Sequence, residues 1–311
     1  MKALVLTQFG GPEHLQMREM PHPEIKEDEA LVKIYAAGVN PVDYKVRNGS
    51  MKFITGRKLP RILGGDLAGV VEQSGKTSSF RPGDKVFAML THATGSYAGF
   101  AAVKESQLCL IPEGISMTEA AATPLAALTA FQAFQKGYGL KPGDMVLVNG
   151  ASGGVGSFAV QIAKAMGAHV TAVCSAANAD FVANLGADNV IDYNKEDFTQ
   201  LDSTFHTVFD AVAKSSFRKC RKMISEGGKY VSTLPNNGLF FYQATNFLRS
   251  KKAFFILTKP YGKDLVQIAD MMEKKRVKAH IQEVFPLEKA AEAHRLMETE
   301  RVRGKLVLKV V

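Results

Sequence analysis

Cysteine is scarce in this chain of 311 residues, which contains only Cys109, Cys174 and Cys220. Three widely separated cysteines form neither a disulfide framework nor a CxxC metal motif, a pattern typical of a reducing compartment. Long apolar runs are also lacking, because no stretch reaches the roughly 20 uncharged residues that a membrane-spanning helix needs. The opening MKALVLTQFGG is too short in its apolar part for a signal peptide and favours a strand. We therefore expect a cytoplasmic protein with no transmembrane segment.

Acidic residues are outnumbered, since 39 Lys and Arg against 30 Asp and Glu give a net charge of +9. Such an excess can attract an anionic cofactor, a membrane surface or nucleic acid. The basic residues are spread along the chain, and their densest run, Lys274, Lys275, Arg276 and Lys278, closes a helical pattern, where cations suit the helix dipole. No helical pattern separates basic from apolar residues clearly. We therefore do not expect nucleic-acid binding and leave peripheral membrane association open.

Two patterns divide the chain, whose mass of 33.7 kDa exceeds the usual size of one hydrophobic core. Up to residue 120, short alternating strands and turns such as the Pro-Gly-Asp of Arg81–Phe87 predict a partly open barrel. Beyond it, strands and helices alternate, beginning with a buried strand at Met145–Asn149, a helix at Val155–Met166 and a strand at His169–Val173. Strict alternation predicts a doubly wound parallel sheet of the kind that binds dinucleotides.

A glycine-rich turn, GASGGVG at residues 150–156, joins the first of these strands to its helix. Small residues let the backbone approach a pyrophosphate closely, and the helix N-terminus then presents free N–H groups to it. Ala151 stands in place of the usual first glycine, and a turn that only packs helix on strand is the alternative. We predict cofactor contacts from six residues of this turn: Gly150, Ser152, Gly153, Gly154, Val155 and Gly156.

No acidic residue stands where the second strand ends, in Val173-Cys174-Ser175-Ala176-Ala177-Asn178. Sites for NAD usually place Asp or Glu there to bind the ribose 2′-hydroxyl. Ser175 and Asn178 can instead donate hydrogen bonds to a 2′-phosphate, although both can also cap the next helix. We therefore predict NADPH as the cofactor in preference to NADH.

Several strings together resemble the zinc-free quinone oxidoreductase and enone reductase branch of the medium-chain dehydrogenase/reductase superfamily. They span nearly the whole chain and are AAGVNPVDYKVRNG, LGGDLAGVV, FRPGDKVF, AAATPLAALTAFQAF, VLVNGASGGVGSFAVQIAKAMGAHVTA and LGADNVIDY. The resemblance implies an α/β fold in which a Rossmann domain, residues 121–261, is inserted into a GroES-like, partly open β-barrel domain, residues 1–120 and 262–311. It also implies a homodimer.

The resemblance assigns roles to single residues as well. Zinc-dependent relatives carry Cys and His where this chain has Asn40 and Gly65, neither of which replaces a thiolate or imidazole ligand, so a metal-free reaction is expected. Asn40 and Thr129 are expected near the nicotinamide. Lys305 matches a basic position that reaches the cofactor phosphates.

The subsite of the adenosine 2′-phosphate is matched in the same way. Ser175 and Tyr193 stand at its serine and tyrosine positions. The family often has lysine where this chain has Asn178, so one cation of the usual site is missing.

The implied reaction is hydride transfer from NADPH to a quinone or to the C=C bond of an α,β-unsaturated carbonyl. Tyr44 and Lys45 are the candidates for stabilising the negative charge that develops on oxygen; alternatively, Tyr44 packs under its loop and Lys45 is solvated. Asp43 is expected to fix this loop through backbone hydrogen bonds. Residues 240–242 are expected to pack in a core rather than line a substrate pocket. Other functions left open are an enoyl-thioester reductase and a crystallin-like or RNA-binding protein that retains the NADPH site.

Overall fold

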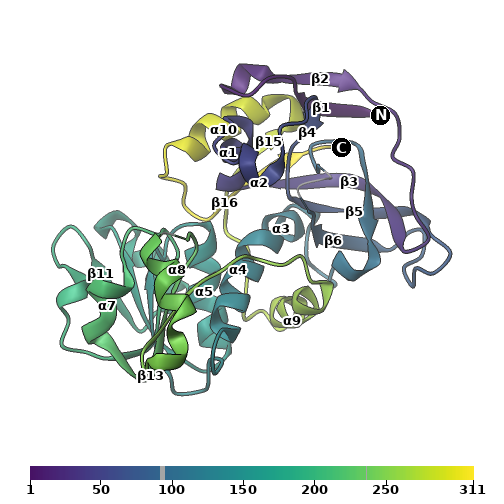
Figure 1. Cartoon of the computed structure of the whole chain (residues 1–311). Coiled ribbons are helices and arrows are strands. Elements are labelled where there is room, and N and C mark those ends of the chain that lie inside the picture. Colours follow the sequence, from purple (N-terminus) through teal and green to yellow (C-terminus); the bar gives the residue numbers. More distant parts are fainter. Residues whose placement is uncertain (92–94, 236) are drawn as a thin grey trace. The chain divides into compact units, whose positions relative to one another are not determined.

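The computed structural model describes residues 1–91, 95–235 and 237–311, which form two compact units (Figure 1). Unit 1 comprises Met1–Leu125, Pro260–Lys274 and Ala279–Val311. Unit 2 comprises Ala126–Lys259 and Lys275–Lys278. The sheets of the two units confirm the predicted fold class, a Rossmann sheet inserted into a GroES-like β domain.

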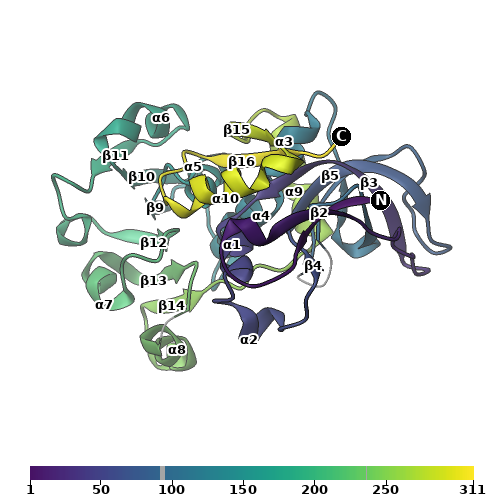
Figure 2. The same cartoon turned by 90° about the horizontal axis from the view of Figure 1, so that it is seen from above.

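Unit 2 is built on a parallel sheet of six strands in the order β11-β10-β9-β12-β13-β14, which follow one another in Figure 2. The strands are β9 (Met145–Asn149), β10 (His169–Cys174), β11 (Asn189–Asp192), β12 (Phe205–Asp210), β13 (Ile224–Ser232) and β14 (Lys252–Phe255). Their apolar residues are buried on both faces, as in MVLVN of β9, because crossover helices cover a parallel sheet on both sides. The order reverses beside β9, and ligands of doubly wound folds bind at such a point.

The helices of this unit follow the strands in alternation. They are α4 (Pro124–Gln135), which begins in unit 1, α5 (Gly154–Ala165), α6 (Ala179–Asn184), α7 (Phe217–Cys220) and α8 (Asn237–Ala244), with short 3₁₀ turns η5 (Arg221–Met223) and η6 (Asn246–Leu248). None of the helices within the described residues is long and apolar enough to cross a membrane.

A buried lysine closes the end of α4. Lys229, in β13, is 1% exposed and donates from Nζ to the carbonyl of Phe134 at 2.7 Å and to that of Lys136. The last carbonyls of a helix lack partners inside the helix, so these bonds satisfy them. The ammonium also lies 5.1 Å from the ring centroid of Tyr138, and burial lowers the pKa of Lys229 to about 8.

Unit 1 contains a seven-stranded, mainly antiparallel sheet and a three-stranded sheet of order β2-β1-β4. The strands of the larger sheet are β3 (Glu29–Val39), β5 (Asp66–Ser74), β6 (Lys85–Met89), β7 (Phe100–Lys104), β8 (Leu108–Leu110), β15 (Ile281–Pro286) and β16 (Lys305–Lys309). Those of the smaller sheet are β1 (Lys2–Leu6), β2 (Leu15–Glu19) and β4 (Arg61–Ile62), and the helices are α1 (Pro41–Arg47), α2 (Lys52–Thr55), α3 (Met117–Ala122), α9 (Gly262–Glu273) and α10 (Ala290–Glu298).

The register of the large sheet brings together distant parts of the sequence. In β3, Gly38 pairs with Asp66 of β5, and Val39 pairs with Leu306 of β16. Gly38 must be glycine, because a Cβ there would lie 2.4 Å from the carbonyl oxygen of Ala121 in α3. The end of β3, the start of β5 and the start of β16 therefore meet where α1 begins.

Candidate functional site

The glycine turn of unit 2 is closely packed at two of its glycines. Gly150 has φ +79°, and a Cβ there would lie 2.4 Å from a methyl carbon of Val212. A Cβ on Gly156 would lie 2.1 Å from the carbonyl oxygen of Gly150. Both positions need glycine for the turn itself, because α5 packs directly on the end of β9.

Gly153 differs, because a Cβ there would meet only the Gly150 carbonyl oxygen, at an ordinary 3.6 Å. It is the N-cap of α5, has extended backbone and offers no side-chain cap to the first turn, Gly154, Val155 and Gly156. The dipole of this twelve-residue helix favours an anion at that end. Open space before uncapped N–H groups fits the diphosphate of a dinucleotide.

Four predicted cofactor residues lie at the same edge of the sheet. The Asn178 amide donates to Ser175 Oγ at 3.2 Å and to Ser152 Oγ at 3.3 Å. Tyr193 follows β11, donates its backbone N–H to the carbonyl of Cys174 at 3.1 Å, and is 56% exposed. The structure thus brings the turn, Ser175, Asn178 and Tyr193 together at the carboxyl ends of β9, β10 and β11.

Thr129 lies in α4 and is buried. Its hydroxyl lies 2.7 Å from the hydroxyl of Thr258, so the two share a hydrogen bond. Thr258 follows β14 and carries no motif that sequence analysis could detect.

Asp210 is another residue that the sequence analysis missed. Its carboxylate accepts hydrogen bonds from the Asn149 amide and the Tyr230 hydroxyl, both at 2.9 Å, and from the N–H of Ser215 at 2.7 Å. These contacts tie together the carboxyl ends of β9, β12 and β13, beside the glycine turn.

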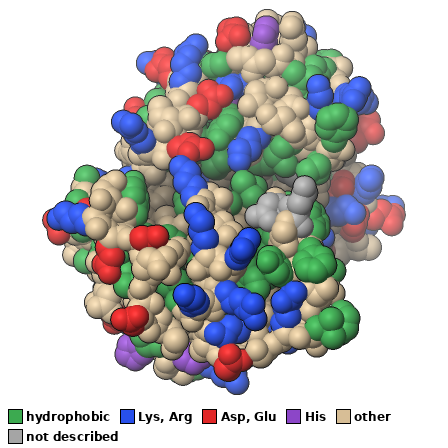
Figure 3. Space-filling model, turned by 60° about the vertical axis from the view of Figure 1, so that its left-hand side comes forward, with side chains coloured by type: hydrophobic (Ala, Val, Ile, Leu, Met, Phe, Trp, Pro, Cys, Tyr) green, Lys and Arg blue, Asp and Glu red, His purple; other side chains and the backbone are tan. Residues whose placement is uncertain are grey.

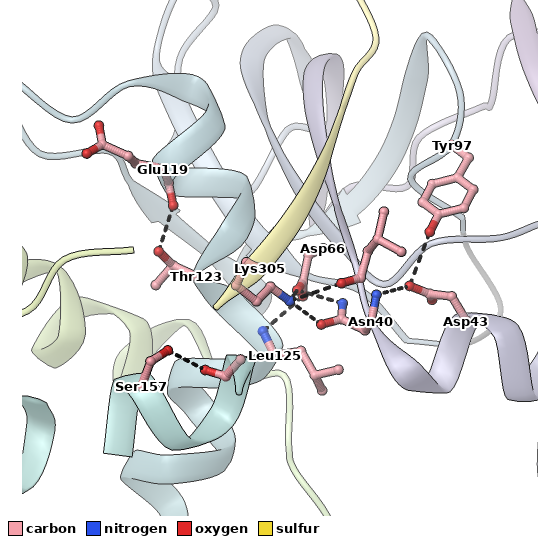
Figure 4. A network of polar contacts seen from close by, with 11 residues as sticks. Asn40, Asp43, Asp66, Tyr97, Glu119, Thr123, Leu125, Ser157 and Lys305 are labelled. Atoms are coloured by element: carbon pink, nitrogen blue, oxygen red, sulfur yellow. Dashed lines mark hydrogen bonds and ion pairs between the residues drawn. The ribbon is translucent and has the colours of Figure 1, made fainter. Parts of the chain in front are cut away.

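Unit 1 contains a buried polar cluster around Asn40, drawn in Figure 4. The Asn40 amide donates to Asp66 Oδ2 at 2.9 Å, and its Oδ1 accepts from Lys305 Nζ. Lys305 Nζ also donates to the carbonyl of Val39 at 3.3 Å and lies 3.8 Å from Asp66 Oδ2, while the N–H of Leu125 donates to Asp66 Oδ1 at 2.9 Å. Lys305 is only 2% exposed, and its ammonium is hydrogen-bonded to Asn40 and paired with Asp66.

A second set of contacts continues from Asn40 through Asp43. The Asn40 N–H donates to Asp43 Oδ2 at 2.8 Å, which makes Asp43 part of the capping box of α1. The Tyr97 hydroxyl donates to the same carboxylate at 3.2 Å and lies 3.2 Å from His294 Nε2. Asp43 therefore fixes the loop as expected, and it has one further partner, Tyr97, that the sequence did not reveal.

Burial dominates the ionisation of this cluster. It raises the pKa of Asp43 to about 7 and that of Asp66 to about 6, against the opposing effects of their hydrogen bonds and of Lys305. Burial lowers the pKa of Lys305, and it lowers that of His294 to about 3, so His294 is neutral near pH 7. Burial thus brings the pKa of both carboxyl groups of the cluster close to neutral pH.

Tyr44 and Lys45 both lie on α1. Tyr44 is partly buried and packs against the apolar core that includes Val46, Leu63 and Met297. Burial, with the nearby Glu300 and Glu298, raises the pKa of Tyr44, so the phenol keeps its proton at neutral pH and can donate a hydrogen bond. Lys45 is partly exposed.

Asn40 and Gly65 stand at the two positions where the family resemblance places zinc ligands of zinc-dependent enzymes. The Asn40 amide is engaged by Asp66 and Lys305, and Gly65 has no side chain, although a Cβ there would contact nothing within 4 Å. Beside Gly65 is a hollow of about 30 Å³, lined also by Asp43, Met89 and Leu90, which has room for about one water molecule. The described part of the chain contains no group of three or more His, Cys, Asp or Glu that could hold a metal ion.

The expectation that residues 240–242 pack in a core holds only for Tyr242. This ring packs against Phe217, with the centroids 4.8 Å apart. Phe240 touches Phe255 but remains 52% exposed, and Phe241 is 61% exposed. Local apolar pattern did not separate inward from outward positions on α8, because three adjacent residues point in different directions around a helix.

Known proteins share both units. Residues 26–113 match the alcohol dehydrogenase GroES-like domain, and residues 185–308 match the family described as zinc-binding dehydrogenase. The chain is 36% identical to the chloroplast envelope quinone oxidoreductase homolog of Arabidopsis thaliana, over 99% of this chain and 98% of that protein. It is 34% identical to the NADPH-dependent alkenal/one oxidoreductase of the same plant, over 99% and 79% of the two chains.

Among solved structures, the quinone oxidoreductase from Coxiella burnetii is similar with a TM-score of 0.89 and 33% identity, covering 100% of this chain and 99% of that one. The fold, the glycine turn and the similarity over the whole chain all point to the same family. The chain belongs to the quinone oxidoreductase branch of the medium-chain dehydrogenase/reductase superfamily.

Proposed function

We propose that this chain binds NADPH at its glycine turn and reduces quinones or the C=C bond of α,β-unsaturated carbonyls by metal-free hydride transfer. The observation that carries the proposal is the open space at Gly153, in front of the uncapped first turn of α5. Relatives named for quinone and NADPH-dependent alkenal/one reduction support the same reaction class.

Discrimination between NADPH and NADH is assigned to Ser175, Asn178 and Tyr193. Two of these side chains offer donors beside Ser152, and Asp180, the nearest acid along α6, is exposed. A 2′-phosphate is therefore expected to be bound rather than repelled. Calorimetry should show NADPH binding several-fold more tightly than NADH, and the reverse order would overturn this assignment.

The catalytic roles are assigned to unit 1. Bound NADPH supplies the hydride, and the electrophilic substrate then develops negative charge on oxygen. Tyr44, protonated at neutral pH, donates a hydrogen bond to that oxygen, and Lys45 adds a cation on the same helix. Asn40, Asp66 and Lys305 are positioning residues, because their polar groups bind one another.

The decisive experiment follows NADPH absorbance with a panel of quinones, enals, enones and acyl thioesters. Turnover of short enones or quinones but not of thioesters is expected. Preference for acyl thioesters would instead indicate an enoyl-thioester reductase. A stoichiometric NADPH complex that no acceptor oxidises would indicate a protein that retains the site without catalysis.

The proposal includes a homodimer in the cytoplasm. β14 is the last strand in the sheet order, and Leu257 just beyond it is 62% exposed, so the edge of the sheet offers a surface for a second copy. Light scattering should give twice the chain mass of 33.7 kDa. A monomer at micromolar concentration would contradict the dimer.

A further inference from the structure

Only one of the two carboxyl oxygens of Asp43 is hydrogen-bonded to the described part of the chain. Asp43 is 4% exposed, and its Oδ2 accepts from the Asn40 N–H at 2.8 Å and from the Tyr97 hydroxyl at 3.2 Å. Its other oxygen, Oδ1, has no hydrogen-bond partner among the described residues. Asp43 also lines the hollow beside Gly65, which has room for about one water molecule.

This asymmetry determines where a proton can be carried on Asp43. Oδ2 already accepts from two donors (Figure 4), so a proton on that oxygen would displace one of them. Oδ1 can carry the proton while both bonds remain. Because burial raises the pKa of Asp43 to about 7, a substantial share of the molecules hold this proton near neutral pH, where a general acid is most effective.

The hollow beside Asp43 exists because residue 65 has no side chain. A Cβ on Gly65 would contact nothing within 4 Å. The N–H groups of Gly64 and Gly65, which both line the hollow, have no hydrogen-bond partner among the described residues, so with Asp43 they supply the polar contacts that a buried water needs. Gly65 also precedes Asp66, which binds Asn40, the residue expected near the nicotinamide.

We propose that Asp43 supplies the proton of the reduction, from Oδ1 through one water held in the hollow to the substrate. The inference rests on the proposed function and adds the proton donor to it. Hydride addition to the β-carbon of an α,β-unsaturated carbonyl leaves an enolate, whose α-carbon takes up one proton. The O–H bond of Asp43 breaks as the water accepts its proton and gives one of its own to the α-carbon. Asp43 is left as a carboxylate and regains a proton from solvent before the next turnover.

The charged groups around Asp43 determine how its proton responds to pH. They are Asp66 of β5, Lys305 of β16, Arg61 of β4 and Tyr97, with His294 of α10 and Arg47 of α1 close to Tyr97. Burial raises the pKa of Tyr97 and lowers that of His294 to about 3, so neither changes charge near pH 7. Surface cations, such as those gathered in the lower half of Figure 3, are screened by salt and affect a buried carboxyl less.

The first test compares the pH profile of kcat with a short enone between Asp43→Asn and the parent. Asparagine keeps an oxygen that can accept from Asn40 and Tyr97, but it has no acidic proton to give. At about pH 6, kcat should fall roughly 100-fold, the scale of general acid catalysis. The decline of parental activity above about pH 7 should disappear, and any dependence that survives belongs to Asp66 or Lys305.

The matched control for this variant is Asp84→Asn. Asp84 is a carboxylate of unit 1 that likewise accepts a backbone N–H, from Arg81 at 2.8 Å, and it does not line the hollow. Its kcat and pH profile should equal those of the parent.

Gly65→Ala tests the water separately from the acid. The methyl group takes the space of the water without a close contact, so Tm should change by about 2 °C or less while kcat falls at least about tenfold. Gly99→Ala is the control, because its Cβ would lie 3.7 Å from the nearest atom, the carbonyl oxygen of Lys2, and Gly99 does not line the hollow. Its kcat should remain parental.

Two results would overturn the inference and leave the proposed function intact. One is an Asp43→Asn variant that turns over like the parent, or more slowly but with the same decline above about pH 7, as damage to the loop alone would give. The other is parental turnover in Gly65→Ala. If no acceptor oxidises NADPH with the parent protein, the proposed function fails and the inference fails with it. Calorimetry should give the parental NADPH affinity for all four variants.

Discussion

The candidate sites of the two units are built from different kinds of polar group. In unit 2 the glycine turn offers backbone N–H groups and open space at Gly153, with almost no charge. In unit 1 the cluster of Asn40, Asp66 and Lys305 buries a carboxylate and an ammonium that bind one another. A site formed by backbone leaves a pattern of small residues in the sequence, whereas a site formed by buried charges depends on contacts between distant strands.

The largest effect is expected where this difference is greatest, at the buried charge of Lys305. Lys305→Met leaves the buried Asp66 carboxylate without its cation and the Asn40 carbonyl oxygen without its donor. It should cost about 3–5 kcal/mol of stability at neutral pH, measured by urea unfolding. Adding Asp66→Asn should recover part of the loss, because no unpaired charge remains. A single variant as stable as the parent would show that the pair contributes little.

A loss of cofactor binding without loss of stability is expected at the turn. Gly153→Val fills the open space with little internal clash, so NADPH affinity should fall at least 100-fold, about 2.7 kcal/mol, while Tm changes by about 2 °C or less. Gly156→Ala is the matched comparison, because its Cβ meets the Gly150 carbonyl oxygen and should lower Tm itself. Unchanged NADPH affinity in Gly153→Val would mean that the phosphates bind elsewhere.

A smaller effect is expected on α1. Tyr44→Phe keeps the ring that packs on the core and removes the donor, so kcat with an enone should fall about tenfold, or 1.4 kcal/mol, with Tm nearly unchanged. Lys45→Ala should have a smaller effect. Tyr138→Phe, a tyrosine change in unit 2, serves as the control. If both α1 variants turn over like the parent, neither residue stabilises the developing charge.

The smallest effect concerns the pH dependence of stability. The pKa of Asp43 is raised from 3.8 to about 7, so the folded state binds this proton more tightly than the unfolded chain. This contribution to stability is present below about pH 4 and is lost as the pH rises toward 7. Asp43→Asn removes it, so the free energy of unfolding should fall less steeply between pH 5 and 7 than in the parent, by on the order of 1 kcal/mol. The Tm profiles of the two proteins should differ in the same direction. Parallel Tm profiles would contradict the shift.

Much of the fold follows from local pattern. Alternation of strands and helices beyond residue 120 predicted the parallel sheet. The end of the second strand pointed to Ser175 and Asn178, which lie beside the turn at 150–156, whereas Tyr193 was expected only from the family resemblance. The cluster of unit 1 was only partly foreseen. Asn40 and Lys305 were identified separately, but 265 residues separate them, and only the pairing of β3 with β16 brings them into contact.

Two other residues were missed by the sequence analysis for the same physical reason. Thr258 and His294 carry no pattern, because each acts through a single partner chosen by tertiary packing, Thr129 and Tyr97 respectively.

Lys229, whose ammonium binds the last carbonyls of α4, can also be used to measure local opening of unit 2. With 1% of Lys229 exposed, an amine-reactive reagent cannot reach its Nζ until the contacts with the carbonyls of Phe134 and Lys136 open. Its labelling rate, read by mass spectrometry against that of an exposed lysine, therefore measures how often this part of unit 2 opens. A ligand that binds the closed state should slow that labelling in proportion to its occupancy.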